Sequence, residues 1–354
     1  MNSFSTSRRS MTPSITLGIL LFSIMVGGVL VSCSPFSFSA TPQATPQPKP
    51  QIYYGVNVKG LNPPSLPGLT AFEAQANKNV AIVMWFQAWG STAGKQNFDP
   101  ALMTAVRDHG SIPMLTWEPW NPGQGPKQPQ YSLTNIIQGH FDSYITQFAQ
   151  AAKAWGHPFF LRFAHEMNEN WYPWGIANGN KPKEYVQAWR HVHDIFTQVG
   201  ATNVTWVWAV SVGSDLKTYQ RLYPGDNYVD WVGMDGYNYG GKTWNSFSTV
   251  FEPTYQSLLK ITNKPFMIAE TATSPKGGDK ASWISDAFST EIPNKFTQVK
   301  AVIWFDENKE QNWTINSSAT AQQAFATAIH AQIYASNQYG NLNTSPIPIP
   351  QNVP

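Results

Sequence analysis

The sequence predicts one large α/β domain of the (β/α)8 TIM-barrel class. Short apolar runs rich in β-branched and aromatic residues alternate eight times with segments of helical periodicity, and such alternation favours a parallel sheet. A count of eight favours closure of that sheet into a barrel, and α/β barrels of about 300 residues commonly form one unit. The alternative is a doubly wound open sheet. Because no glycine-rich phosphate loop follows the first run, a nucleotide-binding version of that sheet is disfavoured.

Eight strands and eight helices account for this domain, which we place at residues 51–338. The expected strands are the apolar runs at 52–57, 80–86, 112–117, 159–164, 204–210, 228–235, 265–270 and 301–305. The expected helices lie at 69–78, 100–109, 133–155, 182–199, 214–222, 246–262, 279–290 and 319–335. The segment 133–155 shows apolar residues close to a 3.6-residue period. Pro182 stands in the first turn of its helix, where a missing N–H is tolerated.

The first residues are predicted to form a lipoprotein-type signal peptide, residues 1–33. Arg8 and Arg9 precede an uncharged apolar stretch at 15–31, and the residues directly before Cys33 resemble a bacterial lipobox. Cleavage there would leave a lipid on Cys33, so we expect the protein at the bacterial cell envelope, lipid-anchored or secreted. An ordinary cleaved signal peptide and an uncleaved membrane anchor are the alternatives.

Two further segments are expected to lie outside the folded domain. Residues 34–50 repeat Thr-Pro-Gln and are typical of a Pro-rich linker, and residues 339–354 form a Pro- and Asn-rich tail. Cys33 is the only cysteine, so no disulfide can form within the chain.

Charge and composition narrow the range of partners. The formal net charge is +2, and Arg8 and Arg9 account for it, so the rest of the chain is near neutral and indicates no basic face for nucleic acid or membrane. We expect a monomer that meets the membrane only through its N-terminal lipid. Aromatic residues make up 14% of the chain, with 15 Trp, and flat indole faces stack on sugar rings. A Trp-rich core is the alternative use of these residues.

Two glutamates follow or end predicted strands. Glu166 comes just after the strand at 159–164, and Glu270 ends the strand at 265–270. In a barrel, both would lie at the C-terminal mouth, where active sites of this fold form. Two carboxylates facing one sugar are the groups that retaining glycoside hydrolysis needs, about 5–5.5 Å apart. For Glu166, a structural ion pair with Arg162 is the alternative.

Other strand ends supply polar and aromatic groups but no cluster of metal ligands, so we expect neither a metal nor a cofactor. Arg162 and Tyr237 are donors that would keep an attacking carboxylate ionised, whereas burial and a negative neighbour would keep the acid protonated. Trp117 and Glu118 end the third strand, and we count both among the expected substrate-binding residues. For Glu118, hydrogen bonding to substrate and structural capping are equally good interpretations.

Four motifs in order along the chain resemble glycoside hydrolase family 26: HEMNENWYPWG, DWVGMDGYN, IAETA and IWFDENK. The resemblance runs from about residue 52 to residue 335 and implies a retaining (β/α)8 enzyme with glutamates on strands 4 and 7. It implies that Glu166 is the general acid/base, preceded by the family's histidine at His165. It also implies that Glu270 is the nucleophile and that Tyr237 hydrogen-bonds it.

The same resemblance implies an aromatic floor at Trp304 and subsite walls at Trp171 and Trp174. It favours an endo-β-1,4-mannanase, with mixed-linkage β-1,3/1,4-glucan or β-xylan as alternative substrates. The WYPWG loop departs from the more aromatic run of many mannanases. A non-catalytic polysaccharide-binding barrel and an enzyme that trims the cell's own exopolysaccharide are further alternatives.

Overall fold

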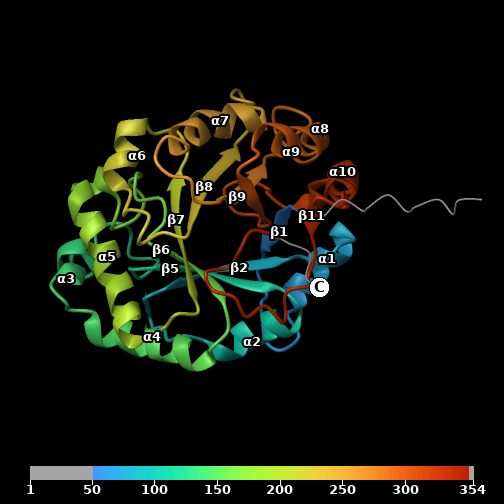
Figure 1. Cartoon of the computed structure of the whole chain (residues 1–354). Helices are drawn as coiled ribbons and strands as arrows, with labels where there is room; N and C mark the ends of the chain where they lie inside the picture. The colour runs from blue at the N-terminus through green and yellow to red at the C-terminus, as the bar shows by residue number, and fades with distance from the viewer. Residues whose placement is uncertain (1–50, 351–354) are drawn as a thin grey trace, which may run out of the picture. The chain divides into compact units, whose positions relative to one another are not determined.

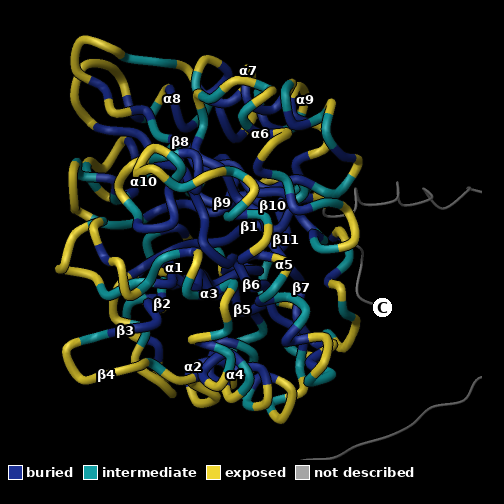
Figure 2. Tube along the Cα trace, turned by 90° about the vertical axis from the view of Figure 1, so that its left-hand side faces the viewer, coloured by how far each residue is buried: buried dark blue, intermediate teal, exposed yellow. Residues whose placement is uncertain are grey.

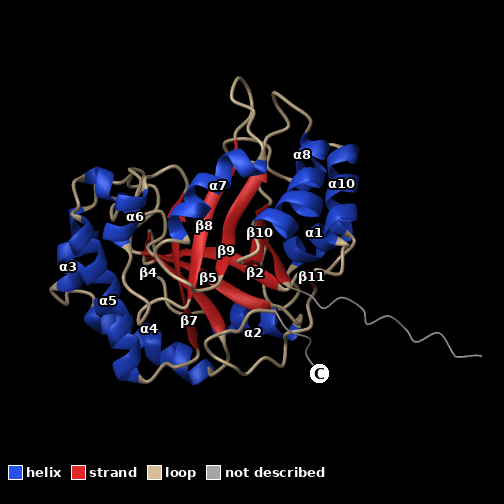
Figure 3. Cartoon of the chain, turned by 45° about the horizontal axis from the view of Figure 1, so that its top comes forward, coloured by secondary structure: helices blue, strands red, loops and turns tan. Residues whose placement is uncertain are grey.

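The computed structural model describes residues 51–350, so the predicted signal peptide with Cys33 and the linker at 34–50 lie outside the described residues. Eight parallel strands form a closed barrel, in the order β1-β2-β5-β6-β7-β8-β9-β10, and β1 pairs with β10 to complete the ring. Figure 1 shows the strands surrounded by the helices, and Figure 3 shows the same enclosure from another side. The predicted (β/α)8 barrel is confirmed.

The barrel strands are β1 Ile52–Asn57, β2 Ile82–Ala88, β5 Ile112–Glu118, β6 Phe159–Phe163, β7 Val204–Ser211, β8 Trp231–Asn238, β9 Phe266–Thr273 and β10 Val299–Phe305. The helices are α1 Pro67–Ala76, α2 Pro100–Asp108, α3 Leu133–Ile137, α4 Asp142–Trp155, α5 Pro182–Val199, α6 Leu216–Leu222, α7 Phe247–Leu258, α8 Lys280–Asp286, α9 Ile292–Lys295 and α10 Ala319–Ile329. Three short strands, β3 Gly90–Ser91, β4 Gly94–Lys95 and β11 Tyr334–Ala335, complete the sheets.

Two predicted helices are interrupted. The segment expected at 133–155 divides into α3 and α4 around Gly139, whose φ of +81° belongs to the left-handed region that glycine adopts readily. The segment expected at 279–290 starts as α8 and continues as a π-helical turn over Ala287–Glu291 before α9. Periodicity alone cannot reveal such breaks, because the apolar spacing continues through them.

The core has two layers, one inside the barrel and one between the barrel and the helices. Met84, Met114, Phe160 and Met267 belong to the inner cluster and are fully buried. The larger outer cluster joins the strands to the surrounding helices, and Figure 2 shows the barrel strands buried within an exposed shell. The strands are therefore buried on both faces, as parallel sheets usually are.

The segment expected as a tail packs against the N-terminal ends of the strands. Tyr339 is buried and its ring meets that of Tyr53 edge-on, with centroids 4.9 Å apart. Trp231 donates its indole N–H to the carbonyl of Ile347 at 2.9 Å, and Ile347 donates its N–H to the hydroxyl of Thr205 at 2.8 Å. The predicted domain boundary at residue 338 is therefore wrong, because residues 339–350 cover apolar side chains of the barrel. Within residues 51–350, no helix is both long and apolar enough to cross a membrane.

Deletion of residues 339–354 should destabilise the barrel, since burial of side chains such as Tyr339 and Ile347 stabilises by about 1.5–3 kcal/mol each. We expect the Tm to fall by at least about 5 °C in thermal denaturation. Ile349→Ala is the matched control, because that side chain is 42% exposed. An unchanged Tm after the deletion would contradict the assignment of this segment to the core.

Candidate active site

The C-terminal ends of the strands surround a cavity of about 720 Å³. Both predicted catalytic glutamates line it, together with Glu118, Trp171 and Tyr237. The remaining lining residues are Phe86, Trp120, Pro122, Tyr172, Ser211, Val212, Asp235, Gly236, Tyr239, Phe305, Glu307, Lys309, Glu310 and Trp313. The cavity thus combines several carboxylates with aromatic walls, as a pocket for a sugar chain requires.

Glu270, on β9, is surrounded by donors. Its Oε2 accepts a hydrogen bond from the hydroxyl of Tyr237 at 2.5 Å, and its Oε1 accepts one from the guanidinium of Arg162. Nε2 of His165 lies 3.9 Å from Oε1. These partners stabilise a negative charge on Glu270 and hold the carboxylate in one orientation.

Arg162, on β6, is fully buried and joins Glu270 to a second acid. Its Nη1 lies 2.8 Å from Oδ2 of Asp235, and its Nε donates to the hydroxyl of Thr116 at 2.8 Å. Burial alone would lower the pKa of Arg162, but Asp235 and Glu270 raise it above the ordinary value, so the guanidinium stays charged. The alternative in which Arg162 pairs with Glu166 is wrong, because the ion pairs of Arg162 go to Asp235 and Glu270.

Glu166 stands on a tight turn directly after β6. Its φ is +53° and that of Ala164 is +43°, so two residues with side chains adopt a conformation that costs about 1–3 kcal/mol each. The N–H of Glu166 donates to the carbonyl of Ala209 at 2.9 Å, and Asn168 donates its side-chain amide to the carbonyl of Ser211 at 2.9 Å. These contacts to β7 hold the turn and aim the carboxyl into the cavity.

The environment of Glu166 favours its protonated form. The side chain is 8% exposed, and burial, helped by the charge of Glu270, raises the pKa of Glu166 to about 8. The indole of Trp171 donates to Oε2 at 2.7 Å and, with Arg162, partly opposes this shift. At neutral pH, Glu166 therefore holds the proton that a general acid delivers.

His165 lies beside Glu270 as a neutral ring. It is 1% exposed, and burial together with the charges of Arg162 and Lys309 lowers its pKa well below the usual value. Its ring packs against Phe86 and Tyr172, with centroids 5.8 and 4.8 Å away. His165 is not itself part of the cavity lining, so it lies behind Glu270 as a polar support.

Glu118, on β5, lines the cavity and is 5% exposed. Its Oε2 accepts a hydrogen bond from the indole of Trp120 at 3.1 Å. Burial raises the pKa of Glu118 to about 7, while that hydrogen bond and the charge of Arg162 oppose the shift. Within residues 51–350 this side chain caps no helix end, which argues against the capping interpretation, and hydrogen bonding to substrate stays a prediction.

Three of the predicted sugar-binding tryptophans, Trp117, Trp304 and Trp174, lie outside the cavity. Trp117 is fully buried and stacks on Phe148 of α4, with ring centroids 4.3 Å apart. Trp304 is fully buried against Phe325 of α10 at 5.0 Å. Successive strand residues point to opposite faces, so where Glu118 and Phe305 face inward, their neighbours Trp117 and Trp304 must face the helices.

Trp174 lies one layer below the wall it was predicted to form. Its ring stacks under Tyr172 with centroids 4.4 Å apart and an interplanar angle of 7°, and its N–H donates to the carbonyl of His165 at 2.6 Å. Tyr172 therefore presents the exposed face, and Trp174 holds it in place. Trp171 does line the cavity and is 45% exposed, so its ring is free to meet a ligand.

Sequence reasoning missed several lining residues, namely Phe86, Trp120, Tyr239, Phe305 and Trp313. No signal in the sequence selects Phe305 over Trp304, because a strand buried on both faces carries no polar alternation to show which residues point inward. Asp235 was recognised as a strand end but not as the partner of Arg162. Nothing in the sequence marks Trp313, because it reaches the cavity from an irregular loop.

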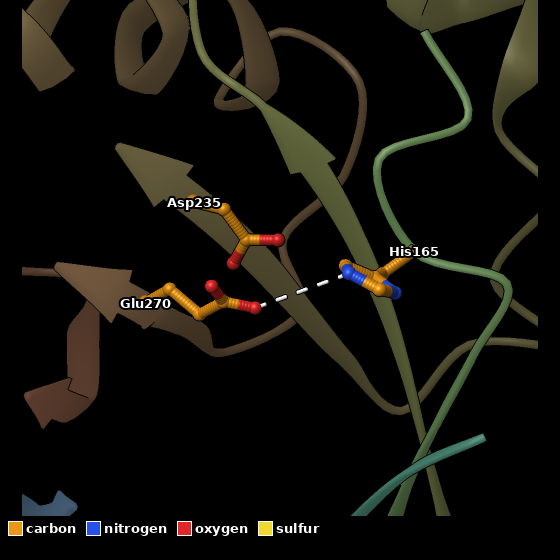
Figure 4. A group of neighbouring side chains, drawn as sticks. All are labelled: His165, Asp235 and Glu270. Atoms are coloured by element: carbon orange, nitrogen blue, oxygen red, sulfur yellow. Dashed lines mark ion pairs between the residues drawn. The ribbon is translucent and has the colours of Figure 1, made fainter. Parts of the chain in front are cut away.

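His165, Asp235 and Glu270 each offer one ligand atom, and these atoms lie within 4.8 Å of one another, a spacing that a metal ion could use. Figure 4 shows the three side chains converging from the β6 turn, β8 and β9. In this structure, however, Arg162 already places its positive charge on both carboxylates. The cluster is therefore explained by the ion pairs of Arg162 with Asp235 and Glu270.

The alkaline limb of the pH–activity profile should follow the ionisation of the Glu166 carboxyl. Because its pKa is raised to about 8, kcat/KM should fall as the pH rises through that value and the acid loses its proton. Trp171→Phe removes a hydrogen bond that favours the ionised form, so the alkaline limb should move to higher pH, by about half a unit to one unit. A pH–rate profile of both proteins measures this, and a limb that moves to lower pH would contradict the assignment.

Comparison with known proteins identifies the family. A profile described as "Glycosyl hydrolase family 26" matches residues 127–330, more than half of the 354-residue chain. The chain is 41% identical over 279 residues to endoglucanase H of Acetivibrio thermocellus, covering 76% of this chain and 29% of that protein. It is 28% identical over 185 residues to the mannan endo-1,4-beta-mannosidase of Bacillus subtilis strain 168, covering 51% of this chain and 47% of that protein. The chain thus spans less than half the length of either relative.

Solved structures share the barrel. The catalytic domain of the GH26 endo-beta-1,4-mannanase of Bacillus sp. JAMB-750 aligns with a TM-score of 0.66 at 19% identity, over 83% of this chain and 90% of that chain. The Bacillus subtilis mannanase man26 aligns with a TM-score of 0.60 at 19% identity, over 82% and 87% of the two chains. At these identities the similarity supports the fold, whereas the family profile supports membership. The chain belongs to glycosyl hydrolase family 26.

Proposed function

We propose that the protein is a retaining endo-β-glycanase that hydrolyses a β-1,4-linked polysaccharide by double displacement. One observation carries this proposal: two glutamates line the same cavity in opposite environments. Glu270 accepts hydrogen bonds from Arg162 and Tyr237, whereas burial raises the pKa of Glu166 to about 8. Two like residues whose surroundings separate their protonation states can divide the roles of nucleophile and acid.

The proposed reaction has two steps. Oε of Glu270 attacks the anomeric carbon while Glu166 gives its proton to the leaving glycosidic oxygen, so a glycosyl ester forms and the bond between the sugars breaks. Glu166, now ionised, takes a proton from water, whose oxygen then displaces Glu270. Arg162 and Tyr237 remain in place to accept the returning charge on Glu270. No metal or cofactor enters either step.

Mannan is the first substrate that we propose. Its support is the resemblance of the motifs and the relatives named mannan endo-1,4-beta-mannosidase, at 28% identity in Bacillus subtilis and 36% over 121 residues in Caldalkalibacillus mannanilyticus. β-Glucan is the second candidate, and the 41% identity to endoglucanase H favours it. That match covers 29% of endoglucanase H, and its name describes the whole of that protein rather than the matched part. A relative named beta-1,3-xylanase, at 26% identity over 143 residues, keeps xylan as a further alternative.

A non-catalytic sugar-binding barrel explains the site less well. Such a barrel would have no use for an acid with a pKa of about 8 beside a second carboxylate held by Arg162 and Tyr237. Burying this many charges is costly unless they serve a purpose.

We also propose a monomer at the bacterial cell envelope, lipid-anchored through Cys33 or secreted. Incorporation of labelled palmitate that depends on Cys33 is the test of the anchor.

Substitutions of the two glutamates should give different outcomes. Glu270→Ala should lower kcat at least about 10⁴-fold, because no covalent intermediate can form. Glu166→Ala should also be slow, but added azide should restore turnover and yield a glycosyl azide, since azide needs no general base. Reducing-sugar release from polysaccharide measures Glu270→Ala. Glu166→Ala is assayed on an aryl glycoside whose phenolate leaves without protonation, by phenolate release and by detection of the glycosyl azide. Wild-type turnover by Glu270→Ala, or azide rescue of neither variant, would contradict the assigned roles.

A panel of polysaccharides should identify the substrate. We expect release of oligosaccharides from mannan, tested beside lichenan, carboxymethylcellulose and xylan, with products separated by chromatography. Because the enzyme is proposed to cut within chains, the products should be a range of lengths rather than monosaccharide alone. Preferential cleavage of lichenan would transfer the assignment to β-glucan, and cleavage of none would contradict the proposed function.

A further inference from the structure

A buried lysine lies behind one wall of the cavity. Lys280 is the first residue of α8 and is 5% exposed, yet it is not part of the cavity lining. Its Nζ donates to the carbonyls of Asn312 at 3.1 Å and Thr314 at 2.9 Å. Burial lowers the pKa of this amine to about 7, with only the charge of Asp306 opposing the shift. Burying an amine in this way is costly, so the position calls for an explanation.

The two carbonyls belong to the segment that follows β10. We call residues 306–314 the β10 loop, and it supplies Glu307, Lys309, Glu310 and Trp313 to the cavity lining. Its regular pairing is a single bridge between Asn308 and Asn312. A loop with so little secondary structure depends on contacts from outside to keep its side chains in place.

Lys59 pairs with Glu307 at 3.0 Å and Ser274 donates to Gln311 at 3.3 Å, and a further group of contacts comes from Lys280 and Trp304. Besides the two bonds from Lys280, the indole of Trp304 donates to the carbonyl of Trp313 at 3.1 Å. Asp306 accepts a hydrogen bond from the N–H of Ile315 at 2.7 Å, which closes the base of the loop. The amine of Lys280 also lies over the ring of Trp304, 5.6 Å from its centroid. Lys280 and Trp304 therefore form one anchor, and this is what Trp304 contributes in place of a sugar-binding surface.

The anchored loop reaches the nucleophile through two side chains. The ring of Trp313 packs against that of Tyr237, with centroids 5.1 Å apart. Tyr237 in turn donates its hydroxyl to Glu270 at 2.5 Å. A shift of the loop would therefore move both the cavity wall and the donor that orients Glu270, and displacements of about 1 Å can slow catalysis about a hundredfold.

We propose that Lys280 is a positioning residue, which holds the β10 loop and, through Trp313 and Tyr237, the nucleophile, without touching substrate. The proposal rests on the proposed function for its kinetic consequence. Its structural consequence, a loop held by the amine, stands independently of any activity.

Lys78 provides a matched control. Its Nζ also donates to backbone carbonyls, those of Ile329 and Tyr334 at 2.7 Å each and that of Ala331 at 3.5 Å, and burial lowers its pKa to about 8. The first two of these partners lie at the end of α10 and in β11, which pairs with the start of β1 at the other end of the barrel. Lys78 thus repeats the chemistry of Lys280 far from the catalytic mouth.

The test compares Lys280→Met with Lys78→Met, each against the wild type. Hydrogen–deuterium exchange should show the amides of 306–314 opening at least about tenfold faster in Lys280→Met and unchanged in Lys78→Met. On the polysaccharide that the wild type cleaves, kcat/KM should fall at least about tenfold in Lys280→Met, with changes in both kcat and KM. In Lys78→Met it should stay within about twofold, even if the Tm falls equally. The proposal would be overturned if residues 306–314 of Lys280→Met exchanged at the wild-type rate. It would also be overturned if the same residues exchanged equally fast in Lys78→Met and in Lys280→Met.

Trp304→Phe is the second variant, for the case in which Lys280→Met does not fold. It removes the hydrogen bond to Trp313 but leaves an aromatic ring and no buried unpaired charge. Hydrogen–deuterium exchange of residues 306–314 should again be faster than in the wild type. An unchanged exchange rate would contradict the role of Trp304 in holding the β10 loop. If the wild type cleaves none of the polysaccharides, the proposed function fails, whereas the exchange comparison still decides the role of Lys280.

Discussion

The catalytic end of this barrel depends on one buried cation. Arg162 is fully enclosed and binds Asp235 and Glu270, so its guanidinium ties β6, β8 and β9 together at the same level. A buried charge without a partner would cost several kcal/mol, and removal of any member leaves the others uncompensated. Glu270, the proposed nucleophile, is therefore held by the same ion pairs that satisfy the buried charges of the barrel, and charge pairing fixes its orientation.

The second glutamate gains its role from the lack of such a network. Within residues 51–350, the carboxyl of Glu166 accepts one hydrogen bond, from Trp171. Burial, together with the nearby charge of Glu270, raises the pKa of this carboxyl to about 8. Since the cation of Arg162 is already shared between Asp235 and Glu270, it offsets the burial of Glu166 only in part. Identical side chains thus have opposite surroundings, since two donors hold Glu270 whereas burial raises the pKa of Glu166, and this is the asymmetry that the proposed double displacement requires.

The sequence was enough to predict the strands and to bring Glu166 and Glu270 to one cavity, but not the facing of the aromatic residues. Apolar runs located all eight strands, and placing Glu166 and Glu270 at their ends required only the rule that barrel sites form at the C-terminal mouth. Trp117 and Trp304 were misplaced because strands buried on both faces carry no polar alternation to show which side is inward. The packing of Tyr339 and Ile347 against the barrel was missed because Pro- and Asn-rich composition does not exclude burial of the few apolar residues between them.

The central claim is that Glu270 becomes covalently bound to the sugar during turnover. Mass spectrometry of peptides after incubation with an activated 2-fluoro glycoside of the cleaved sugar tests it most directly. The account predicts one added fluoroglycosyl group, on the peptide containing Glu270, and none in the Glu270→Ala protein. Labelling of another residue would contradict this claim. Complete hydrolysis of the reagent with inverted anomeric configuration, and with no glycosyl ester detected at any time, would also contradict it.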